Sequence, residues 1–149
     1  MRSPGELSTL FRAQGRKMTP QRQCIFRVLH GNVTHPTAEA IYEVVAAEMP
    51  TISRKTVYQT LHDLADLGEV ELLDVGTGAV RVDPNSHRAH HHLVCEQCGK
   101  VRDVTVDFAG LELPADAEEG FAVHRAEVVF RGRCAECAAA AVPSLIHEP

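Results

Sequence analysis

The sequence predicts an α+β protein that consists of an N-terminal winged helix-turn-helix domain and a small C-terminal α/β domain. Three observations carry this prediction: helical periodicity over residues 5–67, a glycine-rich turn between two short extended stretches, and two Cys-x-x-Cys pairs late in the chain. We expect the domains to cover residues 1–83 and 90–149. A polar linker over 84–89, which contains Pro, Asn and Ser, would join them.

Four helices are predicted in the N-terminal half, and the last three have recognisable start or stop signals. Their apolar periodicity covers residues 5–13, 20–30, 38–48 and 54–67. Pro20 suits the first turn of the second helix, and Thr37 and Ser53 are suitable N-caps for the third and fourth. Gly68 ends the fourth helix.

The fourth helix separates an apolar stripe from a polar face. Val57, Leu61 and Leu64 are spaced to lie on its buried side. The side chains predicted to face elsewhere are Arg54, Lys55, Tyr58, Gln59 and His62. The basic pair stands at the N-terminal end, where a recognition helix meets base edges and phosphates. The alternative interpretation is an ordinary solvated helix face.

A hairpin is predicted directly after the fourth helix. The stretches Glu69–Asp74 and Ala79–Asp83 are extended in pattern, and Gly76-Thr77-Gly78 between them is typical of a hairpin turn. Helices followed by a hairpin of this kind make a winged helix-turn-helix.

Charge is distributed unevenly along the chain. The net charge is −5, but residues 1–60 contain eight Lys or Arg against four acids and are therefore +4, which leaves −9 for residues 61–149. This asymmetry favours an N-terminal part that meets nucleic acid phosphates. The chain has neither an apolar run of about 18 residues nor the apolar segment of a signal peptide, so we expect a cytoplasmic protein without a membrane partner.

The C-terminal half is predicted to begin with a strand over His90–Cys95. Side chains two apart in a strand share a face, so His90 and His92 point together and His91 points the other way. A second strand over Lys100–Asp107 would bring Asp103 to the histidine pair. A third strand is expected at residues 127–130.

The four paired cysteines predict a structural metal site. Cys95, Cys98, Cys134 and Cys137 have the spacing of a tetrahedral zinc site with zinc–sulfur bonds of about 2.3 Å. In a reducing compartment clustered thiols are metal ligands more often than disulfides. The fifth cysteine, Cys24, stands in a helical pattern and is interpreted as a small buried hydrophobe.

Several segments together resemble the ferric uptake regulator family of repressors over nearly the whole chain. The matching segments are Thr19-Pro20-Gln21-Arg22, His35-Pro36-Thr37-Ala38, Ser53-Arg54-Lys55-Thr56-Val57-Tyr58 and the run from His90 to Lys100, which reads HHHLVCEQCGK. The resemblance implies a metal-responsive, homodimeric repressor that is not an enzyme. It would bind palindromic double-stranded operator DNA, and its C-terminal domain would dimerise and hold Zn²⁺ on four cysteines.

The family's regulatory site carries over residue by residue. The resemblance implies the ligand set His35, Asp83, His90, His92 and Asp103. Three imidazoles and two carboxylates suit Fe²⁺ or Mn²⁺ better than thiophilic metals. For DNA contact the resemblance implies Arg16, Lys17, Gln21, Arg22, Ser53, Arg54, Lys55, Thr56, Tyr58 and Gln59, although Gln59 stands where the family commonly has arginine.

Aspartate at both Asp83 and Asp103 is similar to the peroxide-sensing branch of the family. In that branch Fe(II) reacts with hydrogen peroxide, and the oxidised ligand would be His35 or His90. An iron-responsive repressor without peroxide sensing is the alternative. Zinc regulators of the family typically have a linker cysteine, and none stands between Cys24 and Cys95.

Two other classes remain open at this point. A non-haem iron enzyme would use His90, His92 and Asp103 as a facial triad, but these residues follow a DNA-binding pattern. A zinc-ribbon adaptor would bind protein partners through the acidic C-terminal half. Salt-dependent binding to a palindromic duplex separates a repressor from such an adaptor.

Overall fold

The computed structural model describes residues 1–86, 90–106, 114, 120–123 and 126–140. The chain divides into two compact units, Met1–Arg88 and Ala89–Pro149. Residues 87–89 of the predicted linker and the end of the predicted strand at Asp107 lie outside the described residues. No helix in the described part of the chain is both long and apolar enough to cross a membrane.

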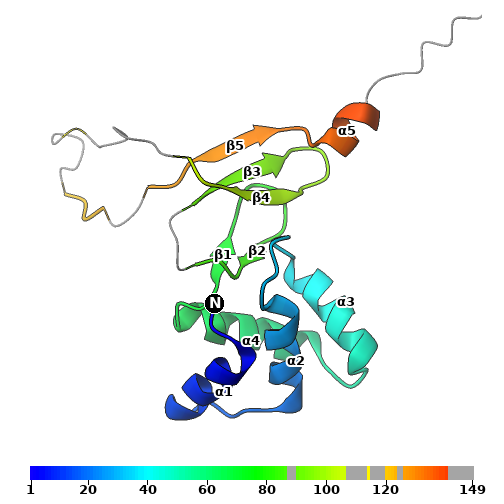
Figure 1. Cartoon of the computed structure of the whole chain (residues 1–149), viewed down its shortest axis with the longest axis vertical. Helices are drawn as coiled ribbons and strands as arrows, with labels where there is room; N and C mark the ends of the chain where they lie inside the picture. Colours follow the sequence, from blue (N-terminus) through cyan, green and yellow to red (C-terminus); the bar gives the residue numbers. More distant parts are fainter. Residues whose placement is uncertain (87–89, 107–113, 115–119, 124–125, 141–149) are drawn as a thin grey trace, which may run out of the picture. The chain divides into compact units, whose positions relative to one another are not determined.

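The described part of the N-terminal unit contains the four predicted helices followed by a hairpin (Figure 1). The helices are α1 (Pro4–Ala13), α2 (Pro20–Leu29), α3 (Ala38–Glu48) and α4 (Arg54–Asp66). The predicted caps Thr37 and Ser53 are confirmed, because each side chain accepts a hydrogen bond from a backbone N–H in the first turn. The side chain of Thr19 caps α2 in the same way.

The helices of this unit enclose one apolar core. Phe11 of α1 meets Phe26 of α2 edge to face, with 4.9 Å between ring centroids, and both side chains are fully buried. Val57, Leu61 and Leu64 of α4 lie in the same core, as the helical spacing predicts. The opposite face of α4 stays exposed and is therefore available for contacts outside the unit.

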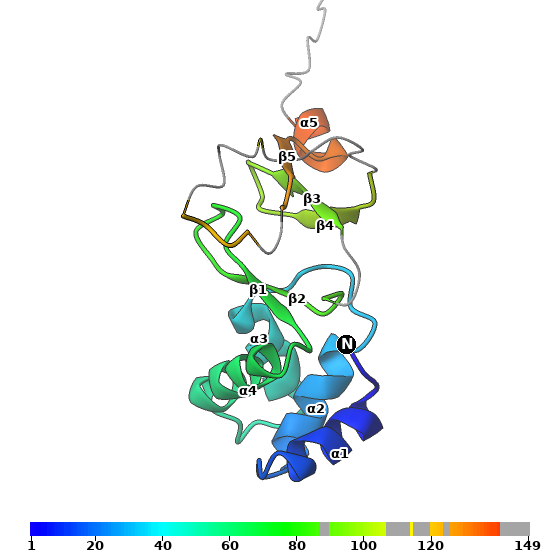
Figure 2. The same ribbon diagram turned by 90° about the vertical axis from the view of Figure 1, so that its left-hand side faces the viewer.

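The hairpin that follows α4 forms the wing (Figure 2). Strands β1 (Glu71–Leu73) and β2 (Arg81–Asp83) pair antiparallel, and both are shorter than predicted. Gly76 and Gly78 between them have positive φ values of 72° and 80°, which glycine adopts at little cost. The chain before α3 joins this sheet, since the Val82 N–H donates to the Pro36 carbonyl.

The described part of the C-terminal unit contains three strands and one short helix. Strands β3 (His91–Cys95), β4 (Val101–Val104) and β5 (Val129–Gly132) form a sheet in the order β4-β3-β5, and α5 (Ala135–Ala140) follows. Strand β4 pairs antiparallel to β3, whereas β5 is parallel to it. The predicted third strand is correct in kind but wrong in position, because pairing begins two residues later.

Candidate metal centres and DNA-contact residues

The four predicted zinc ligands converge in the C-terminal unit. Their Sγ atoms all lie within 4.8 Å of one another, and the Sγ atoms of Cys98 and Cys134 are 3.7 Å apart. A tetrahedral zinc ion with bonds of about 2.3 Å places its sulfur ligands about 3.8 Å apart. The set of four thiols therefore fits a structural zinc ion.

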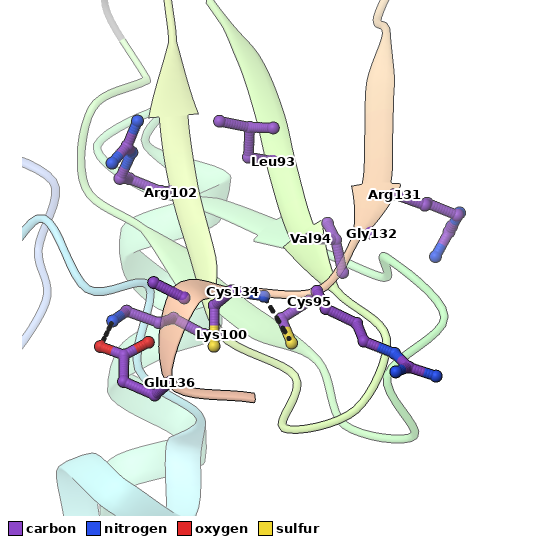
Figure 3. Close-up of a pocket in the computed structure, with 11 residues that line it drawn as sticks. Leu93, Val94, Cys95, Lys100, Arg102, Arg131, Gly132, Cys134 and Glu136 are labelled. Carbon is purple, nitrogen blue, oxygen red and sulfur yellow. Dashed lines mark hydrogen bonds and ion pairs between the residues drawn. The ribbon is translucent and has the colours of Figure 1, made fainter. Parts of the chain in front are cut away.

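The backbone around the cysteines favours a thiolate at one of them. The Cys134 N–H donates to the Cys95 Sγ at 3.3 Å, and this bond together with the Cys98 N–H lowers the pKa of Cys95 to about 6. Figure 3 shows Cys95 and Cys134 side by side where β3 and β5 end, with the Lys100–Glu136 ion pair beside them. That ion pair lowers the pKa of Glu136 to about 2.

His35 and Asp83 lie together in the N-terminal unit. The bond from Val82 to Pro36 holds the segment before α3 against β2, so the His35 Nε2 lies 3.6 Å from the Asp83 Oδ1. Both residues are fully buried. Among the described residues His35 alone is a non-glycine residue with positive φ, at 49°. A non-glycine residue in this left-handed region of backbone conformation costs about 1–3 kcal/mol of strain. Residues strained in this way cluster at functional sites.

His90, His92 and Asp103 converge in the C-terminal unit, as the strand argument predicts. The register places His92 opposite Asp103. The Nε2 atoms of the two histidines are 3.2 Å apart, and the Asp103 Oδ1 lies 3.5 Å from His90 and 3.9 Å from His92. The His91 ring is engaged elsewhere, because its Nδ1 accepts the N–H of Val128 at 3.2 Å.

These three donors fit a small divalent ion. Ligand atoms bonded to one ion at about 2.1 Å with angles near 90–110° lie roughly 3.0–3.4 Å apart. The observed separations approach this range, and the histidine side chains are only 7% and 2% exposed. Imidazole and carboxylate donors suit Fe²⁺ or Mn²⁺ more than the thiophilic metals.

Glu127 is a candidate site residue that the sequence prediction missed. Its Oε1 lies 2.7 Å from the His92 Nδ1, on the side of the ring away from Asp103. A carboxylate in this place fixes the imidazole tautomer whose Nε2 carries the lone pair that can bind a metal. The pattern held no signal for it, since Glu127 precedes β5 and is joined to His92 only through the pairing of β5 with β3.

Most of the residues predicted to contact DNA have partners within the N-terminal unit. Arg16 and Arg22 form ion pairs with the nearly buried Asp63, and Gln59 donates to the same carboxylate at 3.2 Å. Ser53 and Thr56 bond to each other as part of the α4 cap. Arg54 pairs with Glu39.

The other four residues of the predicted set carry no side-chain hydrogen bond or ion pair to the part of the chain that the structure describes. Lys17, Lys55 and Tyr58 are exposed, and Gln21 is half-buried. They are therefore directly available to a partner molecule. Tyr58 and Arg54 are four residues apart in α4, which places them on one face of the helix.

Comparison with known proteins agrees with this arrangement. The model of the ferric uptake regulator family matches residues 13–131. The peroxide-responsive repressor PerR of Staphylococcus aureus is 40% identical over 127 residues, which cover 85% of either chain. The peroxide stress regulator of Campylobacter jejuni has a similar crystal structure, with 28% identity, a TM-score of 0.62 and coverage of 92% of this chain and 100% of that one.

The ferric uptake regulator of Helicobacter pylori has the same fold, with a TM-score of 0.70 over 90% of each chain, but its 20% identity carries no more than the fold. The α+β prediction is thus confirmed. The family match spans α2 to α4, the wing and the strands that hold the clustered histidines and the first cysteine pair. On these grounds the chain belongs to the ferric uptake regulator family of metal-responsive repressors.

Proposed function

We propose that this protein is a homodimeric repressor that binds palindromic operator DNA when Fe²⁺ or Mn²⁺ is bound, and that it senses peroxide through oxidation of a histidine ligand. The observation that carries the proposal is the convergence of His90, His92 and Asp103 on one point of the C-terminal unit. The 40% identity to a peroxide-responsive repressor supports the same assignment.

The proposed regulatory ion takes ligands from both units. His35 and Asp83 would join His90, His92 and Asp103 around it. An ion that binds only when the two ligand groups meet stabilises one arrangement of the units, and that arrangement would place the recognition helices of a dimer in successive major grooves. Metal and operator then strengthen each other's binding by the same factor.

Peroxide sensing requires a ligand that can be damaged. Bound Fe²⁺ would supply the reduction of hydrogen peroxide next to an imidazole. The net reaction places one peroxide oxygen on a ring carbon of His35 or His90 in place of hydrogen, and it releases one molecule of water. The modified ring binds metal weakly, so the ion and the operator would both be released. The aspartates Asp83 and Asp103 are the feature of the ligand set that favours this branch over iron sensing alone.

The first test uses purified protein after metal analysis. Duplexes are selected from a random-sequence pool with the Mn²⁺ form, and binding is then measured with Fe²⁺ or Mn²⁺, before and after hydrogen peroxide. Release with iron but not with manganese, together with a mass gain of one oxygen in a peptide that contains His35 or His90, is expected. Release with neither metal indicates an iron-responsive repressor without peroxide sensing.

The second test concerns the ligands. His35→Ala and His92→Ala should keep the zinc but lose metal-dependent DNA binding. His30→Ala is the matched control, because His30 is an exposed residue at the end of α2. Metal-dependent binding that survives both ligand substitutions would contradict the proposed site.

A further inference from the structure

We propose that Glu39 and Tyr42 hold the guanidinium of Arg54 so that it reads a guanine base in each operator half-site. This inference rests on the proposed DNA-binding function and assigns part of its sequence specificity. All three residues belong to the N-terminal unit, with Glu39 and Tyr42 on α3 and Arg54 at the first position of α4.

The guanidinium group of Arg54 is bound along one edge by Glu39 and contacted on one face by the Tyr42 ring. Its Nε donates to both Glu39 carboxylate oxygens at 3.0 Å, and its Nη2 donates to Oε1 at 2.6 Å. The guanidinium carbon lies 4.3 Å from the centroid of the Tyr42 ring, which is a cation–π contact. Carboxylate and ring together fix the orientation of the guanidinium plane.

Glu39 leaves open the guanidinium edge of Arg54 that can donate two hydrogen bonds to a guanine base. The bonds to Glu39 use the Nε and Nη2 side of the guanidinium, and the Nη1 group has no hydrogen bond to the part of the chain that the structure describes. The outer Nη1–Nη2 edge therefore presents two parallel N–H donors. Guanine offers two acceptors, O6 and N7, at matching spacing in the major groove.

The position of Arg54 suits this role. The first residues of a recognition helix are those that contact base edges. Tyr58 lies one turn further along the same face and is 47% exposed. Glu39 and Tyr58 both line a groove of about 450 Å³ between α4 and the wing. The group formed by Glu39, Tyr42 and Arg54 therefore stands at the edge of the surface that the proposed function assigns to DNA.

The exposure of the Arg54–Glu39 pair argues for orientation rather than stability. The side chains are 60% and 44% exposed, and surface ion pairs of this kind contribute little to folding. An arginine that is ordered before binding loses less rotamer freedom when it binds, an effect worth roughly two- to tenfold in affinity. Since the outer edge is open, DNA does not have to break the pair in order to use it.

The test compares the base preferences of four proteins in their Mn²⁺ form on one random-sequence duplex pool. Arg54→Lys keeps the charge but cannot present two parallel donors. Glu39→Gln removes the carboxylate charge that holds the guanidinium. Glu48→Gln is the matched control, because Glu48 is a glutamate of the same helix α3 that forms an exposed pair with Arg27 of α2 and not with α4.

The wild-type protein is expected to select a guanine at one position of each half-site, with roughly 5- to 150-fold discrimination. Arg54→Lys should lose this preference, Glu39→Gln should weaken it about three- to tenfold, and the control should keep it. Unchanged base preference in Arg54→Lys, or tighter binding with unchanged preference in Glu39→Gln, overturns the inference. If the wild-type protein enriches no sequence at all, the proposed function fails as well, whereas enrichment without an Arg54-dependent guanine overturns this inference alone.

Discussion

Replacing Glu127 by glutamine tests whether the carboxylate behind His92 tunes the regulatory site. His92 is 2% exposed, and its Nδ1 lies 2.7 Å from the Glu127 carboxylate. A hydrogen bond to a charged group contributes about 1.5–3 kcal/mol and a neutral one about 0.5–1.5 kcal/mol. A glutamine side chain can still make a neutral hydrogen bond to His92, but it cannot make a charged one. The expected loss of Mn²⁺ binding free energy is therefore about 1–1.5 kcal/mol, which raises the Kd for Mn²⁺ roughly five- to tenfold.

The assay is a titration of the zinc-loaded protein with Mn²⁺, in which free aquo-manganese is counted by electron paramagnetic resonance. Glu127→Ala should weaken binding more than Glu127→Gln, towards the 100-fold end of the range of about 10–100-fold seen for such outer residues. Glu96→Gln is the control, because Glu96 is an exposed residue of the same unit. If both Glu127 variants bind Mn²⁺ within twofold of the wild type at unchanged zinc content, Glu127 does not act on the metal.

Three further predictions concern stability and affinity. Cys95→Ser should lose zinc and unfold or monomerise the C-terminal unit, which metal analysis and size-exclusion chromatography will show; a stable, zinc-free dimer would contradict the structural assignment. Phe26→Ala should lower the free energy of unfolding by about 3–5 kcal/mol, as measured by urea denaturation, because the fully buried ring packs on Phe11. Operator affinity should fall steeply with added salt, with a slope that decreases by about one when Lys55 is replaced by alanine, while a salt-independent affinity would rule out phosphate contacts.

The elements with strong local signals were predictable from the sequence. The hydroxyl and proline residues at the starts of α2 and α3 act within one helical turn, so their effect does not depend on the rest of the fold. The alternation of His90 and His92 also follows from the geometry of a single strand. Both predictions succeed because the residues that interact are close to each other in the sequence.

Contacts between distant segments were not predictable in the same way. Glu127 reaches His92 only because β5 pairs parallel to β3, and no local pattern fixes that register. The pairing of Arg16 and Arg22 with Asp63 depends on how α2 and α4 pack. For this reason a list of basic residues overestimates the charge that is free to meet DNA.

The proposed linkage separates two kinds of defect in the regulatory site. Moving an equilibrium from 1:99 to 99:1 needs about 5.5 kcal/mol of differential binding. Glu127 contacts one proposed ligand, His92, within the C-terminal unit. Its loss therefore lowers the affinity for the metal without changing which arrangement of the units the metal prefers. Glu127→Gln should therefore shift the midpoint of Mn²⁺-dependent operator binding to higher concentration and keep its plateau.

His35→Ala should instead lower the plateau of Mn²⁺-dependent operator binding. The donors His90, His92 and Asp103 would still bind the ion, but Asp83 alone would remain as its ligand from the N-terminal unit. The ion would then favour the DNA-binding arrangement less, so the plateau of operator binding falls even at saturating Mn²⁺. Operator titrations over a range of Mn²⁺ concentrations distinguish the two outcomes. A plateau of wild-type height in His35→Ala would mean that His35 is not needed to join the two units. The same plateau after Asp83→Ala is added would mean that the metal does not act by joining them, and the DNA-binding arrangement would then have to be set within the C-terminal unit alone.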